Sequence, residues 1–242
     1  MSVVISCDGI SKSFDGKKVL ENIKLDIMQG EIFSIIGPNG SGKTTLIRIL
    51  ATLERQDKGI VKYFGVEMKE EEKLLIFRRK LGYVQQKAVL FAGRVYDNLA
   101  IPLKIRNWEE HKIDKRVEEV AEKLGIKSIL SRNIKNLSGG EAQRVAFGRA
   151  IVAEPQILFL DEFTANLDYR NAGILEQYVK NFVADKRTVV MVSHNIFQVK
   201  RLASRTAILF DGKIIEQGET KRVLEGPENP VAKDFVCGKI PW

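Results

Sequence analysis

The chain has 242 residues, of which 44% are hydrophobic and 29% charged, a balance typical of a globular protein and not of a disordered one. Its 39 Lys and Arg outnumber 31 Asp and Glu and give a net charge of +8. The basic residues are spread along the chain and are not clustered with aromatic residues. This distribution favours a solvated basic surface over a site for nucleic acid or an anionic membrane. No apolar run approaches the ~18–20 residues of a membrane span, and the two cysteines stand at opposite ends of the chain, which disfavours a disulfide framework.

Short apolar runs alternate with helical patterns in the first part of the chain, as in α/β proteins. Residues 23–27, 32–36 and 81–84 are predicted as strands. Residues 43–53 are predicted as a helix because their apolar side chains fall on one face. Those side chains are Leu46, Ile47 and Leu50.

From residue 87 to residue 154 the pattern becomes helical. Residues 108–124 are predicted as a helix, with Asn107 and Glu110 as its N-terminal cap and Gly125 as its stop. The apolar positions at helix spacing are Ile113, Val117, Val120, Ala121 and Leu124.

The last third of the chain returns to alternating elements. Residues 157–160 and 188–192 are predicted as strands, with a helix over 169–184 between them. Residues 207–216 are predicted as a hairpin that turns at Asp211 and Gly212, because Asp-Gly suits a two-residue turn. The sequence therefore predicts a strand-rich α/β core interrupted by a helical insertion over residues 87–154.

Residues 37–44 fit the phosphate-loop pattern G-x-x-x-x-G-K-[ST], and they lie between a predicted strand and a predicted helix, as the motif requires. The glycines let backbone N–H groups point at phosphate oxygens, and the helix N-terminus adds positive potential. Lys43 is expected to reach the β- and γ-phosphates, and the Thr44 hydroxyl to ligate Mg²⁺. A plain glycine-rich turn is the alternative. The expected ATP-binding residues here are Gly37, Pro38, Asn39, Gly40, Ser41, Gly42, Lys43, Thr44 and Thr45.

An apolar strand over residues 157–160 ends in two carboxylates, Asp161 and Glu162. Ligands of open α/β sheets bind beyond the carboxyl ends of the strands. Asp161 is therefore expected to hold Mg²⁺, directly or through water, and Glu162 to polarise a water for attack on the γ-phosphate. The alternative is an acidic helix N-cap.

Residues 137–141, Leu-Ser-Gly-Gly-Glu, begin a predicted helix that runs to about residue 153. Ser138 and Glu141 form a capping-box pattern, S-x-x-E. Two glycines at the helix start leave the backbone open to a large ligand, which predicts a second anion-binding helix terminus. On physical grounds alone a plain capped helix explains the pattern equally well.

Residues 137–144 resemble the signature sequence of the ABC ATPase family, and they lie between the phosphate loop and Asp161, as in that family. The resemblance implies a P-loop NTPase (RecA-like) core with an antiparallel β subdomain and an inserted α-helical subdomain. The whole chain, residues 1–242, would be one such domain, with the core over about 1–86 and 155–242 and the helical subdomain over about 87–154. In this family two subunits form a head-to-tail dimer, so that Ser138, Gly139 and Gly140 would meet the γ-phosphate of the ATP held by the partner.

Three more positions match short motifs of the family. Residues 82–86 resemble the Q-loop, in which Gln86 would contact Mg²⁺ or the attacking water. Asp168 resembles the D-loop aspartate at the dimer interface, and His194 the H-loop histidine that contacts the γ-phosphate. Without the resemblance, Gln86 is a polar strand end and His194 a structural imidazole.

Two positions depart from the family's pattern. Phe14 stands where the family usually has a tyrosine that stacks on adenine, and it keeps the aromatic face needed for stacking. Val19 would flank the base. Phe163 follows Glu162 where importer-type members usually have proline, which puts the local turn in question.

The resemblance implies the ATP-binding and ATP-hydrolysing subunit of an importer-type ABC transporter, acting with ATP and Mg²⁺ at the cytoplasmic face of the cell membrane as a peripheral protein. Its expected partners are membrane permease subunits, a second copy of itself or a related ATPase subunit and, indirectly, a solute-binding protein; no nucleic acid is expected. Residues 89–106 are similar to subunits of oxyanion importers for tungstate, molybdate or phosphate. The alternatives are a non-transport ABC ATPase of iron–sulfur assembly or a cell-envelope switch, a DNA-repair ATPase and a P-loop kinase.

The segment over residues 87–105 has apolar side chains in places where they would add little stability to a domain on its own. We expect it to form an exposed patch that docks a short helix of the membrane subunit beside Gln86. The alternative is that these side chains pack within the helical insertion itself. They are Val89, Leu90, Phe91, Tyr96, Leu99 and Ile101.

Overall fold

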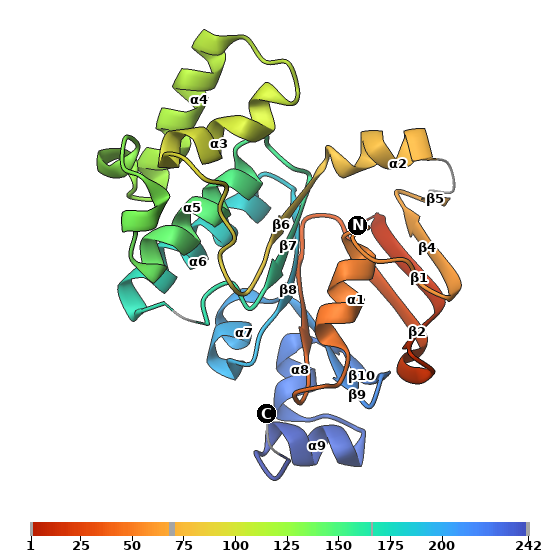
Figure 1. Ribbon diagram of the computed structural model, residues 1–242. Coiled ribbons are helices and arrows are strands. Elements are labelled where there is room, and N and C mark those ends of the chain that lie inside the picture. The colour runs from red at the N-terminus through yellow and green to blue at the C-terminus, as the bar shows by residue number, and fades with distance from the viewer. Residues whose placement is uncertain (1, 68–70, 166, 241–242) are drawn as a thin grey trace.

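The computed structural model describes residues 2–67, 71–165 and 167–240, and two sheets organise them (Figure 1). The smaller sheet has four strands in the order β2-β1-β4-β5, and all its printed pairings are antiparallel, which confirms the expected antiparallel β part. Its strands are β1 (Val3–Phe14), β2 (Lys17–Met28), β4 (Lys58–Tyr63) and β5 (Val66–Glu67).

The larger sheet has six strands in the order β10-β9-β3-β8-β7-β6. Strands β6, β7, β8, β3 and β9 pair in parallel, whereas β10 pairs antiparallel with β9. Because the parallel strands run the same way, the loops that follow β3, β6, β7 and β8 meet at one edge. The strands are β3 (Ile32–Ile36), β6 (Leu81–Val84), β7 (Ile157–Asp161), β8 (Thr188–Val192), β9 (Arg205–Phe210) and β10 (Lys213–Glu219).

The larger sheet is covered on both faces, so its strands carry apolar side chains in both directions. In β7, Phe159 joins the cluster that contains α1 and the smaller sheet, whereas Leu158 and Leu160 join the cluster formed with the other helices. Burial on both faces explains why these strands are short continuous apolar runs. The helices are α1 (Lys43–Leu50), α2 (Glu71–Arg78), α3 (Val95–Lys104), α4 (Glu110–Lys123), α5 (Gly139–Ile151), α6 (Tyr169–Ala184), α7 (Ile196–Leu202), α8 (Thr220–Glu225) and α9 (Pro230–Val236).

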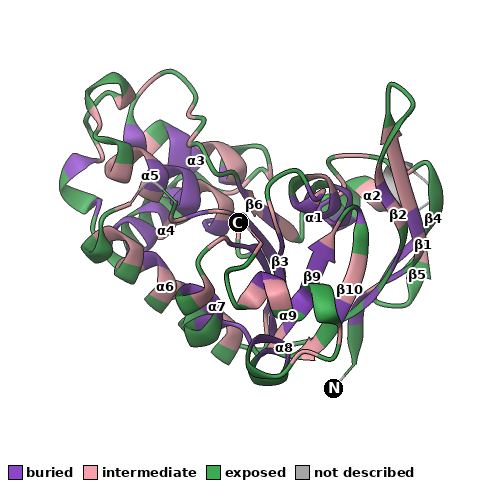
Figure 2. Cartoon of the chain, turned by 90° about the horizontal axis from the view of Figure 1, so that it is seen from below, coloured by how far each residue is buried: buried purple, intermediate pink, exposed green. Residues whose placement is uncertain are grey.

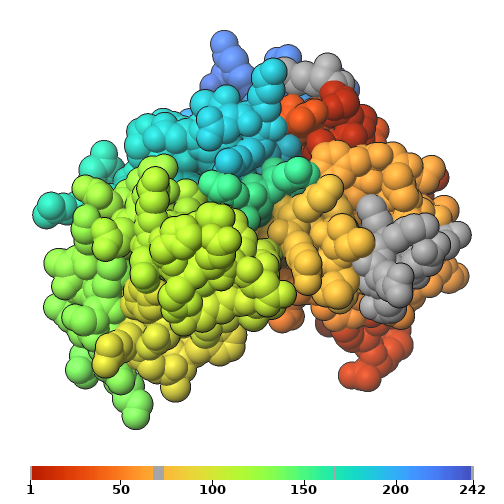
Figure 3. Space-filling view, turned by 90° about the horizontal axis from the view of Figure 1, so that it is seen from above, coloured from red at the N-terminus to blue at the C-terminus, as the bar shows by residue number. Residues whose placement is uncertain are grey.

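Helices α3, α4 and α5 gather on one side of the molecule, where residues from about 90 to 130 form a lobe in the space-filling view (Figure 3). Their apolar side chains belong to the same buried cluster as one face of the larger sheet. Leu99, Val120 and Phe147 are all fully buried there. In the described part of the chain, no helix combines the length and apolar character that crossing a membrane requires.

The predicted element boundaries differ from the structure at two helix ends. The helix predicted over 43–53 ends at Leu50, because the chain turns through Thr52 with φ 61°. The N-cap of α4 is Glu109 and not Asn107. Asn107 has φ 57° and its N–H bonds the carbonyl of Lys104, so it closes the turn after α3 instead of starting α4.

Two predicted turns are confirmed. Gly125 follows the end of α4 with φ 63°, the left-handed conformation that stops many helices. Asp211 and Gly212 have φ 44° and 73° between β9 and β10, as a type I′ hairpin turn requires.

The two cysteines lie in opposite environments. Cys7 is buried in β1 between the strands that flank it, and burial followed by the charge of Asp26 raises the pKa of its thiol to about 12. Cys237 is exposed at the end of α9. Figure 2 shows the general pattern, with burial concentrated in the strands and on the inner faces of the helices.

Candidate active site

The loop between β3 and α1 has the conformation that its glycines permit. Gly37, Gly40 and Gly42 have φ values of 153°, 79° and 102°. A Cβ atom at Gly37 would lie 2.0 Å from the carbonyl oxygen of Leu209, so only glycine fits there. The tight loop ends at Gly42, which is the N-cap of α1, and it therefore places the start of α1 at the edge where the parallel strands end.

Lys43 lies inside this loop, with only 5% of the residue exposed. Its ammonium donates hydrogen bonds of 2.8 Å to the carbonyl oxygens of Gly37 and Pro38. Burial lowers the pKa of Lys43, while the carboxylates of Glu162 and Asp161 act in the opposite direction. The loop thus encloses a cation that phosphate oxygens can bind in place of the two carbonyls.

Asp161 ends β7 as a buried carboxylate with two hydroxyl neighbours. Thr44 Oγ1 lies 3.5 Å from Asp161 Oδ1, and the Tyr83 hydroxyl donates to Oδ2 at 3.3 Å. Burial raises the pKa of the Asp161 carboxyl, against the hydrogen bond from Tyr83. Tyr83 lies within residues 82–86, and the motif alone gave it no role. Its position on the strand next to β7 is the signal that could have revealed this contact.

The carboxylate of Glu162 lies between two side chains from neighbouring strand ends. Gln86 Nε2 donates a 2.6 Å hydrogen bond to Glu162 Oε2, and His194 Nε2 contacts Glu162 Oε1. The backbone of Glu162 is left-handed, with φ 48°, and its N–H bonds the carbonyl of Val192 at 3.0 Å. The ends of β6, β7 and β8 therefore bring the three expected catalytic side chains together.

These groups open into one pocket of about 430 Å³ beside the loop. The pocket joins the phosphate loop with the three side chains at the strand ends, and a residue of β2 completes it. It is lined by Val19, Asn39, Gly40, Gly42, Lys43, Thr44, Thr45, Gln86, Glu162 and His194. Gly37, Pro38 and Ser41 belong to the same loop without lining the pocket, and Asp161 lies behind it against Thr44.

Phe14 does not line this pocket. It ends β1 at 44% exposure, and the Lys12 ammonium lies 4.9 Å from the centre of its ring. Lys12 is held by ion pairs to Glu54 at 2.7 Å and to Asp57 at 3.4 Å. One face of the Phe14 ring therefore has a cation near it, a feature that the sequence analysis did not predict.

The signature residues also lie outside the pocket, at the N-terminus of α5. The predicted capping box is confirmed: the Glu141 N–H donates to Ser138 Oγ at 3.2 Å, and the Ser138 N–H donates to Glu141 Oε2 at 2.8 Å. Ser138 and Gly139 are exposed. The predicted second phosphate site is thus an open helix end that no residue of the pocket reaches.

Asp168 lies beside the signature. It caps α6 by accepting hydrogen bonds of 2.8 and 2.6 Å from the backbone and side chain of Asn171. A Cβ atom at Gly140 would lie 3.1 Å from Asn171 Nδ2, so the starts of α5 and α6 touch at this point. The signature and Asp168 therefore share one surface.

A buried glutamine of the signature joins α5 to the segments that follow β6 and β7. The sequence predicted no separate role for it. Gln143 is 5% exposed, and its Nε2 donates to the carbonyl oxygens of Gln85 at 3.1 Å and Phe163 at 3.2 Å. Phe163 is 1% exposed, and its ring lies 6.1 Å from that of Phe147. The turn after Glu162, where importer-type members usually have proline, is thus anchored by the buried side chain of Phe163.

The apolar segment after Gln86 is only partly exposed. Leu99 is fully buried, and Leu90 and Tyr96 pack against the core, so the expectation of a six-residue exposed patch is wrong for these three. Tyr96 and Leu99 pack inward because α3 buries one face against α4 and α5, whereas Leu90 lies in the loop before α3. Val89 and Phe91 are 58% and 54% exposed.

Phe91 is held in its exposed position by two polar side chains. Asn98, which is fully buried, accepts from the Phe91 N–H at 2.8 Å and donates to the Phe91 carbonyl at 2.9 Å. The Arg149 guanidinium lies 4.8 Å from the Phe91 ring centre and donates to the Val89 carbonyl at 2.6 Å. The loop is therefore pre-formed with an aromatic side chain on its outer face.

Comparisons with known proteins point to one family. The family model described as "ABC transporter" matches residues 20–165. The chain is 40% identical over 245 residues to the phosphate import ATP-binding protein PstB 2 of Natronomonas pharaonis, covering 97% of this chain and 86% of that protein. It is 34% identical over 253 residues to a probable anion import ATP-binding protein of Haloferax volcanii, covering 98% and 88%.

One similar solved structure is of a cassette in a state that follows ATP hydrolysis. The ATP-binding cassette MJ0796, a dimer bound to ADP and phosphate after hydrolysis, is similar with a TM-score of 0.83 at 28% identity. The match covers 89% of this chain and 98% of that one. The resemblance therefore extends over most of the fold.

Proposed function

Because this chain belongs to the ABC transporter family of ATP-binding proteins, we propose that it powers the import of a small inorganic oxyanion of the phosphate type. The chain is an ATPase of the importer type, and the other ATPase classes weighed above are not favoured, since relatives that match nearly its whole length are import proteins. The observation that carries the mechanism is the single pocket in which Lys43, Gln86, Glu162 and His194 meet.

In this mechanism the phosphates of ATP occupy the loop over residues 37–44. Backbone N–H groups and the Lys43 ammonium bind the β- and γ-phosphates. Glu162 accepts a proton from the attacking water or orients it. His194 and Gln86 hold Glu162, and of these two His194 would contact the γ-phosphate and Gln86 would contact Mg²⁺ or the attacking water. Their observed contacts with the carboxylate support these roles.

Mg²⁺ fits the donor set at the end of β7. The Asp161 carboxylate and the Thr44 hydroxyl are hard oxygen ligands 3.5 Å apart. Burial raises the pKa of Asp161 and so disfavours its charged form, and a bound cation would stabilise that charge. Gln86 would complete the protein ligands. When bound, the ion neutralises charge that develops on the phosphate oxygens.

The base of the nucleotide would lie toward the smaller sheet. Val19 lines the pocket next to Gly42, and Phe14 offers an exposed aromatic ring at the end of β1. We assign adenine stacking to Phe14 and a flanking contact to Val19.

The second site acts in a dimer. Ser138, Gly139 and Gly140 stand at an exposed helix N-terminus that can bind the γ-phosphate of a nucleotide held by another copy. Asp168 lies on the same surface and would contact the partner. The dimeric state of a similar cassette supports this arrangement.

Coupling to a membrane permease would pass through residues 87–154, which we take as a helical subdomain on a core formed by about 1–86 and 155–242. Phe91, fixed by Asn98 and Arg149, follows Gln86 by five residues and offers an apolar contact for a permease helix. The chain would therefore sit at the cytoplasmic face of the membrane, with a solute-binding protein as a more distant partner.

The cargo is tested in proteoliposomes that hold the chain with the membrane permease that co-purifies with it. ATP-dependent uptake of radiolabelled phosphate, competed by molybdate or tungstate, is the expected result. Glu162→Gln in the same complex is the control for dependence on hydrolysis. Uptake of methionine or a polyamine instead of an oxyanion would contradict the proposed cargo while leaving the ATPase assignment intact.

A further inference from the structure

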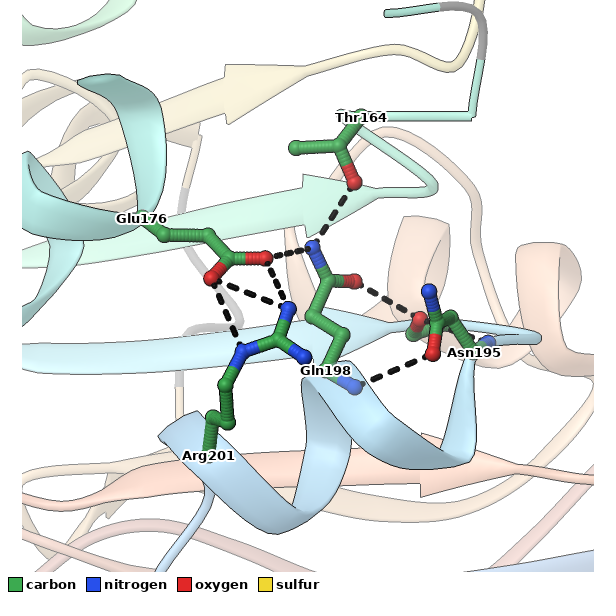
Figure 4. A network of polar contacts seen from close by, with 6 residues as sticks. Thr164, Glu176, Asn195, Gln198 and Arg201 are labelled. Atoms are coloured by element: carbon green, nitrogen blue, oxygen red, sulfur yellow. Dashed lines mark hydrogen bonds and ion pairs between the residues drawn. The ribbon is translucent and has the colours of Figure 1, made fainter. Parts of the chain in front are cut away.

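A buried amide joins the two loops that carry Glu162 and His194. Gln198 lies in the first turn of α7 and is 3% exposed. Its Oε1 accepts a 2.8 Å hydrogen bond from Ser193 Oγ, and its Nε2 donates to Thr164 Oγ1 at 2.7 Å (Figure 4). Both ends of this one side chain are therefore engaged by different loops.

The positions of these partners place the amide close to the chemistry. Ser193 directly precedes His194, and Thr164 follows Glu162 by two residues. Because His194 and Glu162 also contact each other, side chains join the two loops at two places: at the catalytic pair and at Gln198. Gln198 and the catalytic pair line a common pocket next to the phosphate-loop pocket, which Gln198 itself does not line.

A third element fixes the direction of the amide. Gln198 Nε2 also donates to Glu176 Oε1 of α6 at 3.0 Å. Arg201, one turn along α7, donates to both oxygens of Glu176 at 2.9 and 3.2 Å through Nη2. The Gln198 N–H bonds Asn195 Oδ1 at 3.1 Å and completes the helix cap. Both amide hydrogens and the amide oxygen thus have partners, so rotation about the last bond of the side chain would break all three contacts.

We propose that Gln198 is a positioning residue for ATP hydrolysis, which holds the loop of His194 and the segment after Glu162 in one fixed relation. The inference rests on the proposed function, because it deepens the role of that same site. A buried amide with three partners restricts both loops, and a small misplacement of a catalytic carboxylate costs rate far more than it costs substrate binding. Since Gln198 does not reach the phosphate loop, ATP affinity depends on other residues.

The test compares Gln198→Met with Arg201→Gln. Methionine has a similar shape and no hydrogen bonds to offer, so it cuts the links to Ser193 and Thr164. Arg201→Gln weakens the attachment of α7 to α6 through Glu176. It leaves in place the hydrogen bonds of Gln198 to Ser193 and Thr164, which join the two loops, so it is the matched control. We expect kcat to fall at least about tenfold in Gln198→Met, with ATP affinity measured by a fluorescent ATP analogue within about twofold of wild type. Arg201→Gln should keep its kcat even where its melting temperature falls.

A double-mutant cycle with Thr164→Val adds a readout that a general loss of stability would not move. Thr164→Val removes one hydroxyl at constant shape, and its effect on kcat should nearly vanish in the Gln198→Met background because both changes cut the same link. If Gln198→Met does not fold, Thr164→Val alone must lower kcat at unchanged ATP affinity.

Three results would overturn the proposal: wild-type kcat in a folded Gln198→Met, an equal loss in Arg201→Gln, or fully additive effects in the cycle. An absence of ATPase activity in the wild-type chain would refute the proposed function instead, so the two failures are distinguishable.

Discussion

Gln86 and Glu162 are joined across the ends of β6 and β7 by a 2.6 Å hydrogen bond from the Gln86 amide to the Glu162 carboxylate. The contact links the last core residue before the helical insertion to the residue expected to act on water. A γ-phosphate that binds Gln86 would therefore also change the surroundings of the base.

Glu162→Gln should bind ATP and hydrolyse it at least about 10²-fold more slowly, because the amide has no basic oxygen for the attacking water. The trapped ATP should hold two copies together. Phosphate release and size-exclusion chromatography with and without ATP and Mg²⁺ measure both effects. Glu154→Gln, a change of an exposed carboxylate after α5, is the control. A Glu162→Gln chain that stays monomeric and turns over at the wild-type rate would remove Glu162 from its role.

Lys43→Ala should lose most ATP affinity and nearly all hydrolysis. The side chain supplies a cation inside the loop, and its two 2.8 Å hydrogen bonds also hold the carbonyls of Gly37 and Pro38. Titration with a fluorescent ATP analogue measures the loss. Lys180→Ala, on the exposed face of α6, should bind as the wild type does. Normal binding by Lys43→Ala would contradict the assignment.

Mixing Ser138→Arg with Lys43→Ala tests whether the signature acts on a partner's nucleotide. The mixed dimer has one intact composite site and one doubly damaged site, so ATPase activity should rise above that of either variant alone. Two different affinity tags show that the mixed dimer forms. No recovery in a sample that contains this dimer would count against sites that work independently.

Glu141 should make the stability of the chain depend on pH. Hydrogen bonds from Ser138, first from its backbone N–H, lower the pKa of Glu141 below its usual 4.5. Because the pKa of Glu141 is lower in the folded state, its ionised carboxylate stabilises the fold at pH values above the pKa of the unfolded state. This stabilisation is lost as the pH falls through the folded-state pKa. Glu141→Gln should therefore cost roughly 0.5–1 kcal/mol at pH 7 and less below pH ~4.

Urea unfolding of Glu141→Gln at pH 7, 5 and 3.5 measures this trend. Glu118→Gln, an exposed carboxylate 3.6 Å from Lys127, should change stability little at any of these values. A cost for Glu141→Gln that stays constant over the range would rule out the charge as its source.

Phe91→Asp should abolish co-purification with the permease and leave the ATPase of the isolated chain near the wild-type rate. The side chain is over half exposed, so its loss should not disturb the core. Val231→Asp, an exposed apolar position on α9, is the control. Intact assembly and transport with Phe91→Asp would show that the permease docks elsewhere.

Much of the larger sheet was predictable because its strands are buried on both faces and read as short apolar runs, as at 32–36, 81–84 and 188–192. β1 was missed since Val3–Phe14 mixes polar and apolar residues and its pairing shifts register repeatedly. The motif residues were found because phosphate chemistry fixes their spacing along the chain. Tyr83, Gln143 and Gln198 were not assigned roles, because folding sets their contacts, and each has a partner 20 or more residues away in the chain. The roles of all these residues in catalysis stay predictions.

The opposite surroundings of the two thiols give the natural chain a built-in reporter of its own motions. A thiol with a pKa near 12 and almost no exposure is inert to maleimides at neutral pH, whereas Cys237 stands open to them. Cys237 therefore takes a single fluorophore without any engineered cysteine. Once it is blocked, slow modification of Cys7 counts the occasions on which β1 separates from its neighbours, and the effect of ATP on that rate measures how far nucleotide binding tightens the smaller sheet.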